Sequence, residues 1–215
     1  FIYMDEKEGW KVSEYVKNVR IPDYHNFEDT KRILKVLREL HEHNLTVDWE
    51  FLPWEEALKI EDLLNAKDPS TMRNFLPLKE KIAKLVEAVK GDGIEKRFCH
   101  CDTYAPNWML TDNETILIDW EYSGNADPGC DLGAYIMDAM YEVEETEKFI
   151  GEYLQENNTP VAMFHHLAYV AIISYYWFVW ALYRESCGAV MGESLHNWHT
   201  MAEKYSTYLV EKYLK

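Results

Sequence analysis

Three side chains near the middle of the chain have the types and spacing of a magnesium phosphate site. Asn107 follows Asp102 by five residues, and the apolar run that ends at residue 118 leads directly into Asp119, all within the segment HCDTYAPNWMLTDNETILIDWEY at 100–122. Mg²⁺ prefers hard oxygen ligands, usually one or two carboxylates together with water and substrate phosphates. Phosphoryl transfer also needs a carboxylate that orients the attacking hydroxyl. Asp102 could be that base and Asn107 and Asp119 the metal ligands, although Asp and Asn are also ordinary turn-forming residues.

A second candidate site is an aromatic stripe in the long apolar segment near the end of the chain. Trp177 and Trp180 are three residues apart, so on a helix they share one face, and they stand among Tyr175, Tyr176 and Tyr183. A quaternary ammonium has no N–H group to donate and is recognised by aromatic faces, at roughly 0.5 to 2 kcal/mol per face. The stripe could therefore bind an organic cation, or it could be part of the core.

The elements that must position these groups are mostly helices. Apolar residues recur at helical spacing, and the pattern predicts helices at 26–43, 54–65, 71–90, 130–142, 144–157, 160–186 and 194–213. A short strand is expected at 97–100, and strands at 108–110 and 115–119 are expected to form a hairpin closed by the turn TDNE. No linker divides the pattern. The sequence therefore predicts one compact, mostly helical α+β unit with a small β-hairpin that carries the catalytic and metal-binding segments.

Composition limits the classes of function. The chain of 215 residues has 22 Lys and Arg against 38 Asp and Glu, a net charge of −16, so it should repel nucleic acids and attract cations. Residues 167–182 carry no charge, but this run of 16 is shorter than the roughly 20 residues that span a bilayer, so we expect a buried helix and no membrane partner. The four cysteines lack the paired spacing of a zinc site, which predicts reduced thiols in a cytoplasmic protein.

The central region contains motifs that resemble those of the kinase-like phosphotransferases, a superfamily that includes choline, ethanolamine and aminoglycoside kinases. The similar segments are H-x-D-x-x-x-x-N at 100–107 (catalytic loop), IDWEYSG at 118–124 (metal-binding segment) and ADPGCDLG at 126–133 (the D-P-x-x-D-L stretch that follows). The resemblance implies that Asp102 is the base and that Asn107 and Asp119 bind Mg²⁺. The residues that it implies as supports of the loop or neighbours of the metal are His100, Glu121 and Asp131.

The closest resemblance is to the bacterial choline kinases of the LicA type, and it covers the whole chain. Late helices of choline kinases carry a W-x-x-W pair that helps to enclose the trimethylammonium group, and Trp177 and Trp180 match it. Asp138 matches an acidic position of the choline site, and Tyr141 and Tyr176 are implied as further walls. The resemblance thus implies an ATP-dependent kinase that converts choline to phosphocholine.

The first residues resemble the hinge on which the adenine of ATP hangs in such kinases, through backbone groups of Tyr3, Met4 and Asp5. The chain contains no GxGxxG or Walker-type glycine loop to cover the phosphates. We therefore expect residues 1–20 to be a hinge strand and connector from a missing N-terminal lobe. Residues 21–215 are expected to be the helical C-terminal lobe of a protein-kinase-like fold, with the catalytic loop and the choline pocket.

Two other functions remain open from the sequence. An ethanolamine or aminoglycoside kinase would bind substrates with N–H donors, which call for carboxylates and carbonyls and make less use of an aromatic cage. A non-catalytic module that captures quaternary amines would need the aromatic stripe but not the set formed by Asp102, Asn107 and Asp119.

Overall fold

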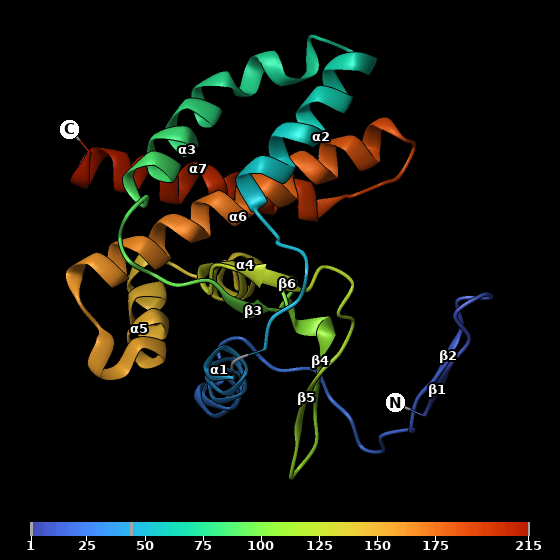
Figure 1. Ribbon diagram of the computed structural model, residues 1–215. Coiled ribbons are helices and arrows are strands. Elements are labelled where there is room, and N and C mark those ends of the chain that lie inside the picture. Colours follow the sequence, from blue (N-terminus) through green and yellow to red (C-terminus); the bar gives the residue numbers. More distant parts are fainter. Residues whose placement is uncertain (1, 44, 215) are drawn as a thin grey trace.

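The computed structural model describes residues 2–43 and 45–214 of the chain. It is mostly helical, as predicted, with three small two-stranded β elements (Figure 1). In chain order the elements are β1 Tyr3–Met4, β2 Lys11–Val12, α1 Phe27–Glu42, α2 Pro53–Lys67, the 3₁₀ helix η1 Thr71–Phe75, α3 Leu76–Ala88, β3 Arg97–Cys99, the 3₁₀ helix η2 Ala105–Asn107, β4 Trp108–Leu110, β5 Thr115–Leu117, β6 Gly124–Ala126, α4 Gly129–Ala139, α5 Val143–Leu154, the 3₁₀ helix η3 Gln155–Asn157, α6 Pro160–Ser186 and α7 Glu193–Tyr213.

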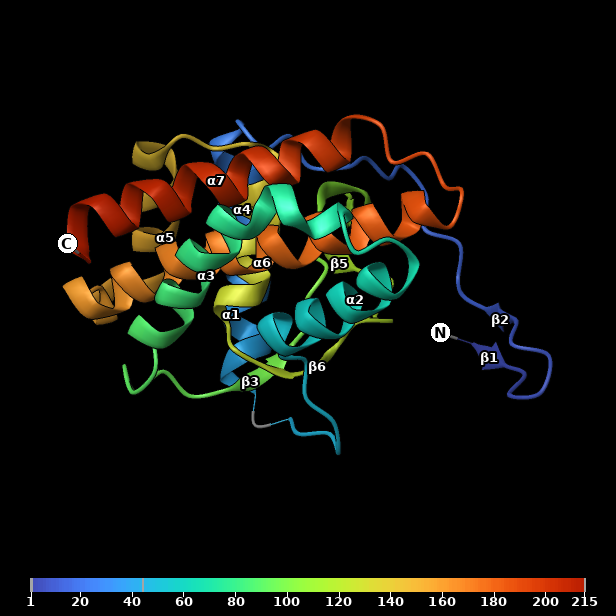
Figure 2. The ribbon, with the colours of Figure 1, turned by 90° about the horizontal axis from the view of Figure 1, so that it is seen from above.

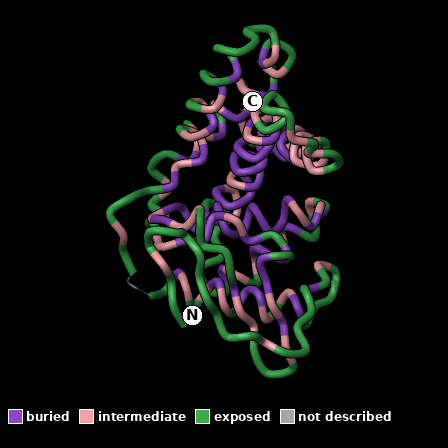
Figure 3. Tube along the Cα trace, turned by 90° about the vertical axis from the view of Figure 1, so that its right-hand side faces the viewer, coloured by how far each residue is buried: buried purple, intermediate pink, exposed green. Residues whose placement is uncertain are grey.

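Helix α6 forms the centre of the molecule. It is apolar on all sides, so it is stable only when other elements cover it, and α2, α3, α4, α5 and α7 all pack against it (Figure 2). Its middle turns are buried, as Figure 3 shows. By length and composition α6 could cross a membrane, but 78% of its most apolar window is buried within the protein. It packs as the core helix that the sequence predicts.

The strands form local pairs on one side of this helical layer. β4 and β5 make the predicted hairpin, in which Trp108 pairs with Leu117 and Leu110 with Thr115. β3 pairs in antiparallel fashion with β6, a strand that the sequence pattern does not predict. The pairing holds the segment after β3 beside the segment after β5, so the two candidate catalytic segments meet.

One predicted helix is divided in the structure. The segment expected as a single helix at 71–90 begins as η1 and continues as α3 from Leu76. Pro77 lies in the first turn of α3, where its fixed φ and missing N–H are tolerated. The other predicted helices agree with the structure to within a few residues at each end.

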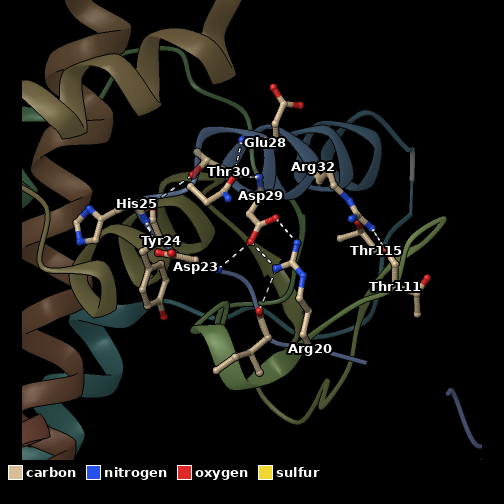
Figure 4. A network of polar contacts seen from close by, with 12 residues as sticks. Arg20, Asp23, Tyr24, His25, Glu28, Asp29, Thr30, Arg32, Thr111 and Thr115 are labelled. Atoms are coloured by element: carbon tan, nitrogen blue, oxygen red, sulfur yellow. Dashed lines mark hydrogen bonds and ion pairs between the residues drawn. The ribbon is translucent and has the colours of Figure 1, made fainter. Parts of the chain in front are cut away.

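The connector before α1 is held by a buried carboxylate. The guanidinium of Arg20 donates to Asp29 through two hydrogen bonds of 2.5 and 2.6 Å, and the N–H of Asp23 donates to the same carboxylate at 2.9 Å (Figure 4). Asn26 caps α1 by accepting hydrogen bonds from the first backbone N–H groups of the helix. The connector therefore enters α1 in one fixed conformation.

The same region is tied to the β4–β5 hairpin. Arg20 and Leu110 exchange backbone hydrogen bonds of 3.0 and 2.8 Å. From α1, the side chain of Arg32 donates to the Thr115 hydroxyl at 2.9 Å and to the Thr111 carbonyl at 2.8 Å (Figure 4). These contacts fix the hairpin against α1, and with it the residues that flank the hairpin.

The β1–β2 hairpin projects from the body of the molecule, as both ribbon views show (Figures 1 and 2). Tyr3 pairs with Val12 and Met4 with Lys11, and the rings of Tyr3 and Trp10 lie 5.3 Å apart. Phe1, the first residue of the expected hinge strand, lies outside the described residues. The hinge role of residues 3–5 stays a prediction.

Candidate active site

The loop after β3 brings Asp102 and Asn107 together. The short helix η2 reverses the chain between them, and Asn107 Nδ2 donates to the Asp102 carbonyl oxygen at 2.8 Å and to its Oδ2 at 3.0 Å. Asn107 is buried and Asp102 is half-buried. The amide nitrogen of Asn107 is a donor and does not bind a cation, so its Oδ1 is the atom that it can offer to a metal ion.

Asp119 lies two residues beyond β5, beside the same loop. The N–H of Ile118 donates to the Asn107 carbonyl at 2.9 Å, which extends the hairpin pairing by one residue. Asp119 then adopts φ +66°, in the left-handed region that aspartate tolerates better than most residues, and its side chain is exposed. The strand expected at 115–119 thus ends at Leu117. The candidate catalytic and metal-binding residues lie at the open end of the hairpin, just beyond the ends of its two strands.

The carboxylates around this end form an acidic cluster. Burial raises the pKa of Asp102 to about 7, and the negative charges of Asp119, Glu121 and Asp138 act in the same direction, against the hydrogen bond from Asn107. A divalent cation would relieve this repulsion, and carboxylate and amide oxygens are the donors that Mg²⁺ prefers. The residues present therefore fit a magnesium site.

The raised pKa of Asp102 predicts how stability depends on pH. Its folded pKa of about 7 lies above the value of about 3.9 expected in the unfolded chain. The folded protein is therefore stabilised by protonated Asp102, fully below about pH 4, and this stabilisation is lost as the pH rises through about 7. We expect the Tm of the wild-type protein, without metal, to fall more between about pH 5 and pH 8 than that of Asp102→Asn. Thermal melts across this range check it, and parallel profiles would contradict it.

His100 connects the catalytic loop to the metal-binding segment. Its Nε2 lies 2.8 Å from the Ile118 carbonyl, and its Nδ1 accepts the N–H of Asp102 at 3.3 Å. Burial lowers the pKa of His100, so the ring is neutral and carries its proton on Nε2, the nitrogen that must donate. The ring also meets Trp120 edge to face at 4.7 Å. One neutral imidazole thus sets the spacing between the two segments.

Asp131 anchors the loop from α4. Its carboxylate accepts the backbone N–H groups of His100 at 3.1 Å and Cys101 at 2.6 Å, and it lies 2.8 Å from His41 Nε2. Despite full burial, the hydrogen bond and charge of His41 hold the pKa of Asp131 below its usual value. Asp131 lies inside α4 and is not the helix N-cap, which is Pro128.

His41 completes this support and was not identified from the sequence. It lies on α1, and its Nδ1 is 2.8 Å from the Tyr153 hydroxyl of α5. The ligand atoms of His41, Cys99 and Asp131 lie within 4.8 Å of one another. Burial raises the pKa of the Cys99 thiol, which makes it a poor metal ligand. His41 and Asp131 therefore act as a buried support for the loop after β3.

The aromatic residues of α6 meet rings from two other segments. Tyr122 and Tyr176 each lie 5.1 Å from Trp177 between ring centroids, and Trp180 and Trp198 lie 5.4 and 5.7 Å from it. We call these five residues the aromatic cluster. Trp177 is 5% exposed and its Nε1–H has no partner among the described residues, whereas Trp180, Trp198 and Tyr122 are half-buried.

Tyr122 was assigned no role from the sequence, although it directly follows Glu121 in the metal-binding segment. Burial raises the pKa of Tyr122 to about 12, and the charges of Glu121 and Asp102 add to this effect. The aromatic cluster therefore lies against the acidic cluster. The position of Tyr122 inside the motif IDWEYSG at 118–124 was the signal that could have identified it.

The structure separates the two remaining candidates for the substrate pocket. Asp138, on α4, accepts a hydrogen bond from Tyr24 and is close enough to Asp102 for its charge to raise that pKa. Tyr141 instead packs on Tyr135 and Phe149, at the edge of a cavity of about 500 Å³ between α1 and α5. Asp138 thus belongs with the catalytic loop, whereas Tyr141 contacts a different set of rings.

A family model described as the phosphotransferase enzyme family matches residues 23–167, about two thirds of the chain. Protein LicA from Haemophilus influenzae is 24% identical over 205 residues, which cover 88% of this chain and 59% of LicA. The chain therefore spans less than two thirds of the length of that relative.

Solved structures show the same fold. The choline kinase LicA from Streptococcus pneumoniae superposes with a TM-score of 0.81 and 26% identity, over 96% of this chain and 73% of that one. A structure of LicA in complex with AMP superposes with a TM-score of 0.76 and 24% identity, over 96% of this chain and 72% of that one. The resemblance to LicA-type choline kinases and the predicted fold class are confirmed, and the chain belongs to the phosphotransferase enzyme family.

Proposed function

We propose that this chain is the substrate-binding and catalytic part of an ATP-dependent kinase that phosphorylates the hydroxyl of choline. The observation that carries this proposal is the contact between the two clusters. Tyr122 directly follows Glu121 of the metal-binding segment and packs on Trp177 at 5.1 Å, so a cation held by the aromatic rings would lie beside Asp102.

In this proposal Asp102 orients the hydroxyl and accepts its proton. A carboxyl with a pKa of about 7 is ionised for a large fraction of the time near neutral pH and is still basic enough to take a proton. Asn107 Oδ1 and Asp119 would hold Mg²⁺, with Glu121 nearby. When bound, the ion would supply the positive charge that offsets the negative charge on the transferring phosphoryl group.

The trimethylammonium group would be held by Trp177, Trp180 and Tyr176, with Tyr122 and Trp198 as further walls. Each face contributes roughly 0.5 to 2 kcal/mol of cation–π attraction, more when water is excluded. The carboxylate of Asp138 would supply the opposite charge. Tyr141 would contribute through its contacts with neighbouring residues, because its ring packs elsewhere.

We further propose that residues 1–20 are the hinge of the nucleotide site, with Tyr3, Met4 and Asp5 near the adenine and 21–215 as the lobe that binds the alcohol. A cavity of about 900 Å³ between residues 11–18 and the β4–β5 hairpin supports this proposal, since Asp119 and Trp120 also line it. ATP would enter on that side and the alcohol on the side of α6. A cytoplasmic location follows as part of the proposal, because ATP is plentiful there and the four cysteines are free.

Ethanolamine kinase is the second candidate function. Asp102, Glu121 and Asp138 bring three carboxylates near the pocket, and a primary ammonium could donate hydrogen bonds to them. The half-buried tryptophans favour the methylated cation instead.

A phosphorylation assay on the full-length protein tests the proposal. ATP and Mg²⁺ would be supplied with choline, ethanolamine or kanamycin, and we expect the highest kcat/KM for choline. Faster turnover of ethanolamine or kanamycin would mean that this compound, and not choline, represents the substrate class. Calorimetric binding of choline without turnover of any alcohol would favour a non-catalytic binding module.

The aromatic cluster can be tested with matched tryptophan variants. Trp180→Leu should weaken choline binding about 5- to 30-fold, which corresponds to a loss of about 1 to 2 kcal/mol of cation–π attraction. Trp54→Leu, an equally half-buried tryptophan on α2 outside the aromatic cluster, should leave it within about twofold of wild type. Calorimetric titration measures both. Equal effects of the two variants would mean that Trp180 is only part of the core.

A further inference from the structure

The hydroxyl of Tyr24 joins two parts of the candidate active site. It donates to Asp138 Oδ2 on α4 and accepts the backbone N–H of Ala105 at 2.6 Å. Ala105 is the first residue of η2, the turn that ends in Asn107. One oxygen therefore contacts both the carboxylate expected to face the substrate cation and the turn that carries a candidate magnesium ligand.

Tyr24 is itself held rigidly by its surroundings. Its carbonyl oxygen accepts hydrogen bonds from the hydroxyls of Tyr141 and Thr30, the latter at 3.2 Å, and its ring meets Tyr135 edge to face at 4.8 Å. The next residue towards the N-terminus is Asp23, whose N–H is fixed by the Arg20–Asp29 pair (Figure 4). The hydroxyl is thus positioned before any substrate binds.

Asp138 depends on this hydroxyl. Burial raises the pKa of Asp138, and the hydrogen bond from Tyr24 is the largest influence in the opposite direction. Among the described residues, no other side chain donates a hydrogen bond to Asp138 within normal distance. Without this hydroxyl the half-buried carboxylate would keep only the backbone N–H of Ala105 as a donor, and the loss of a donor to a half-buried charge is costly.

We propose that Tyr24 is a positioning residue for the phosphotransferase reaction, which holds the Asp138 carboxylate towards the substrate ammonium and fixes the 105–107 turn. The inference rests on the proposed function, because it needs a cationic substrate. It gives Tyr24 two separable effects: the bond to Asp138 acts on cation binding, and the bond to Ala105 acts on Asn107 and therefore on turnover.

The test compares choline with its neutral carbon isostere, 3,3-dimethylbutan-1-ol, on the full-length protein. Tyr24→Phe removes the hydroxyl and keeps the ring. We expect KM for choline to rise about tenfold, as for the loss of one charge-assisted hydrogen bond, with kcat lowered about threefold. KM for the isostere should stay within about twofold of wild type, because it carries no charge for Asp138 to attract.

Two further variants separate positioning from general disruption. Tyr208→Phe removes a hydroxyl of a half-buried tyrosine that bonds Lys212 on α7 and contacts neither Tyr24 nor its two targets, so its KM for choline should stay close to that of wild type. In an Asp138→Asn background, adding Tyr24→Phe should lower kcat but change KM no further. An unchanged KM in Tyr24→Phe, or an equal rise in the Asp138→Asn background, would overturn the role of Tyr24. Failure of the wild type to phosphorylate choline would overturn the proposed function, and this inference with it.

Discussion

Asp102→Asn is expected to lower kcat for choline by about a thousandfold or more, with a folded protein that still binds choline. Positioned general bases contribute roughly 10² to 10⁴ in rate. Asparagine has nearly the same shape, and its Oδ1 can still accept the hydrogen bond that Asn107 Nδ2 donates at 3.0 Å. What it cannot do is accept the proton of the hydroxyl, so the loss should fall on kcat and not on binding.

Single-turnover phosphorylation and choline calorimetry on the same variant measure this effect. Asp62→Asn, the same substitution at an exposed position of α2, is the control and should retain wild-type activity. At pH 8 the Asp102→Asn variant should also be more stable than wild type, because it has no half-buried carboxylate to ionise. Activity within tenfold of wild type would exclude Asp102 as the base.

The second large effect is expected for Asp131→Ala, which should cost more than about 3 kcal/mol in the free energy of unfolding. The substitution leaves the buried His41 ring and the N–H groups of His100 and Cys101 without the acceptor that they share. Each unsatisfied buried donor costs about 1 to 3 kcal/mol. Urea denaturation at neutral pH measures the loss.

The pH dependence of that loss identifies its cause. Asp131 has a lowered pKa in the folded protein, so its stabilisation is present above about pH 4 and is lost as the pH falls through the folded pKa. The difference between wild type and Asp131→Ala should therefore shrink in acid. Asp131→Asn, which keeps one carbonyl acceptor, should be intermediate. A cost below about 1 kcal/mol for Asp131→Ala would mean that other groups hold the loop.

The helices could be predicted because each carries a periodic apolar face or, in α6, a long and mostly apolar segment that begins at Pro160 and ends at Ser186. The strand β6 could not be predicted from the sequence. Its sequence, Gly124–Ala126, has no strand preference, and it pairs with β3 through backbone groups that any residue supplies. Tertiary pairing, and not local sequence, makes it a strand.

The residues of the candidate site also divide into those that local sequence motifs identify and those that only tertiary contacts reveal. Asp102, Asn107 and Asp119 could be named because they fall in compact motifs. Tyr24 and His41 could not, because their partners Ala105 and Asp131 lie 81 and 90 residues away in the sequence. Nothing in the local pattern distinguishes them from other residues at the start or inner face of an amphipathic helix. Such contacts become visible only when the chain is folded.

The position of the aromatic cluster has a consequence for how this enzyme could evolve towards other alcohols. In the proposed function Trp177 is at once a wall of the choline pocket and a core residue of α6, so replacing it would cost stability as well as specificity. Trp198 on α7 and Tyr122 in a turn face the same rings but are half-buried. Substitutions at these two positions should therefore be the first to change substrate preference during evolution, because they alter the pocket at a smaller cost in stability.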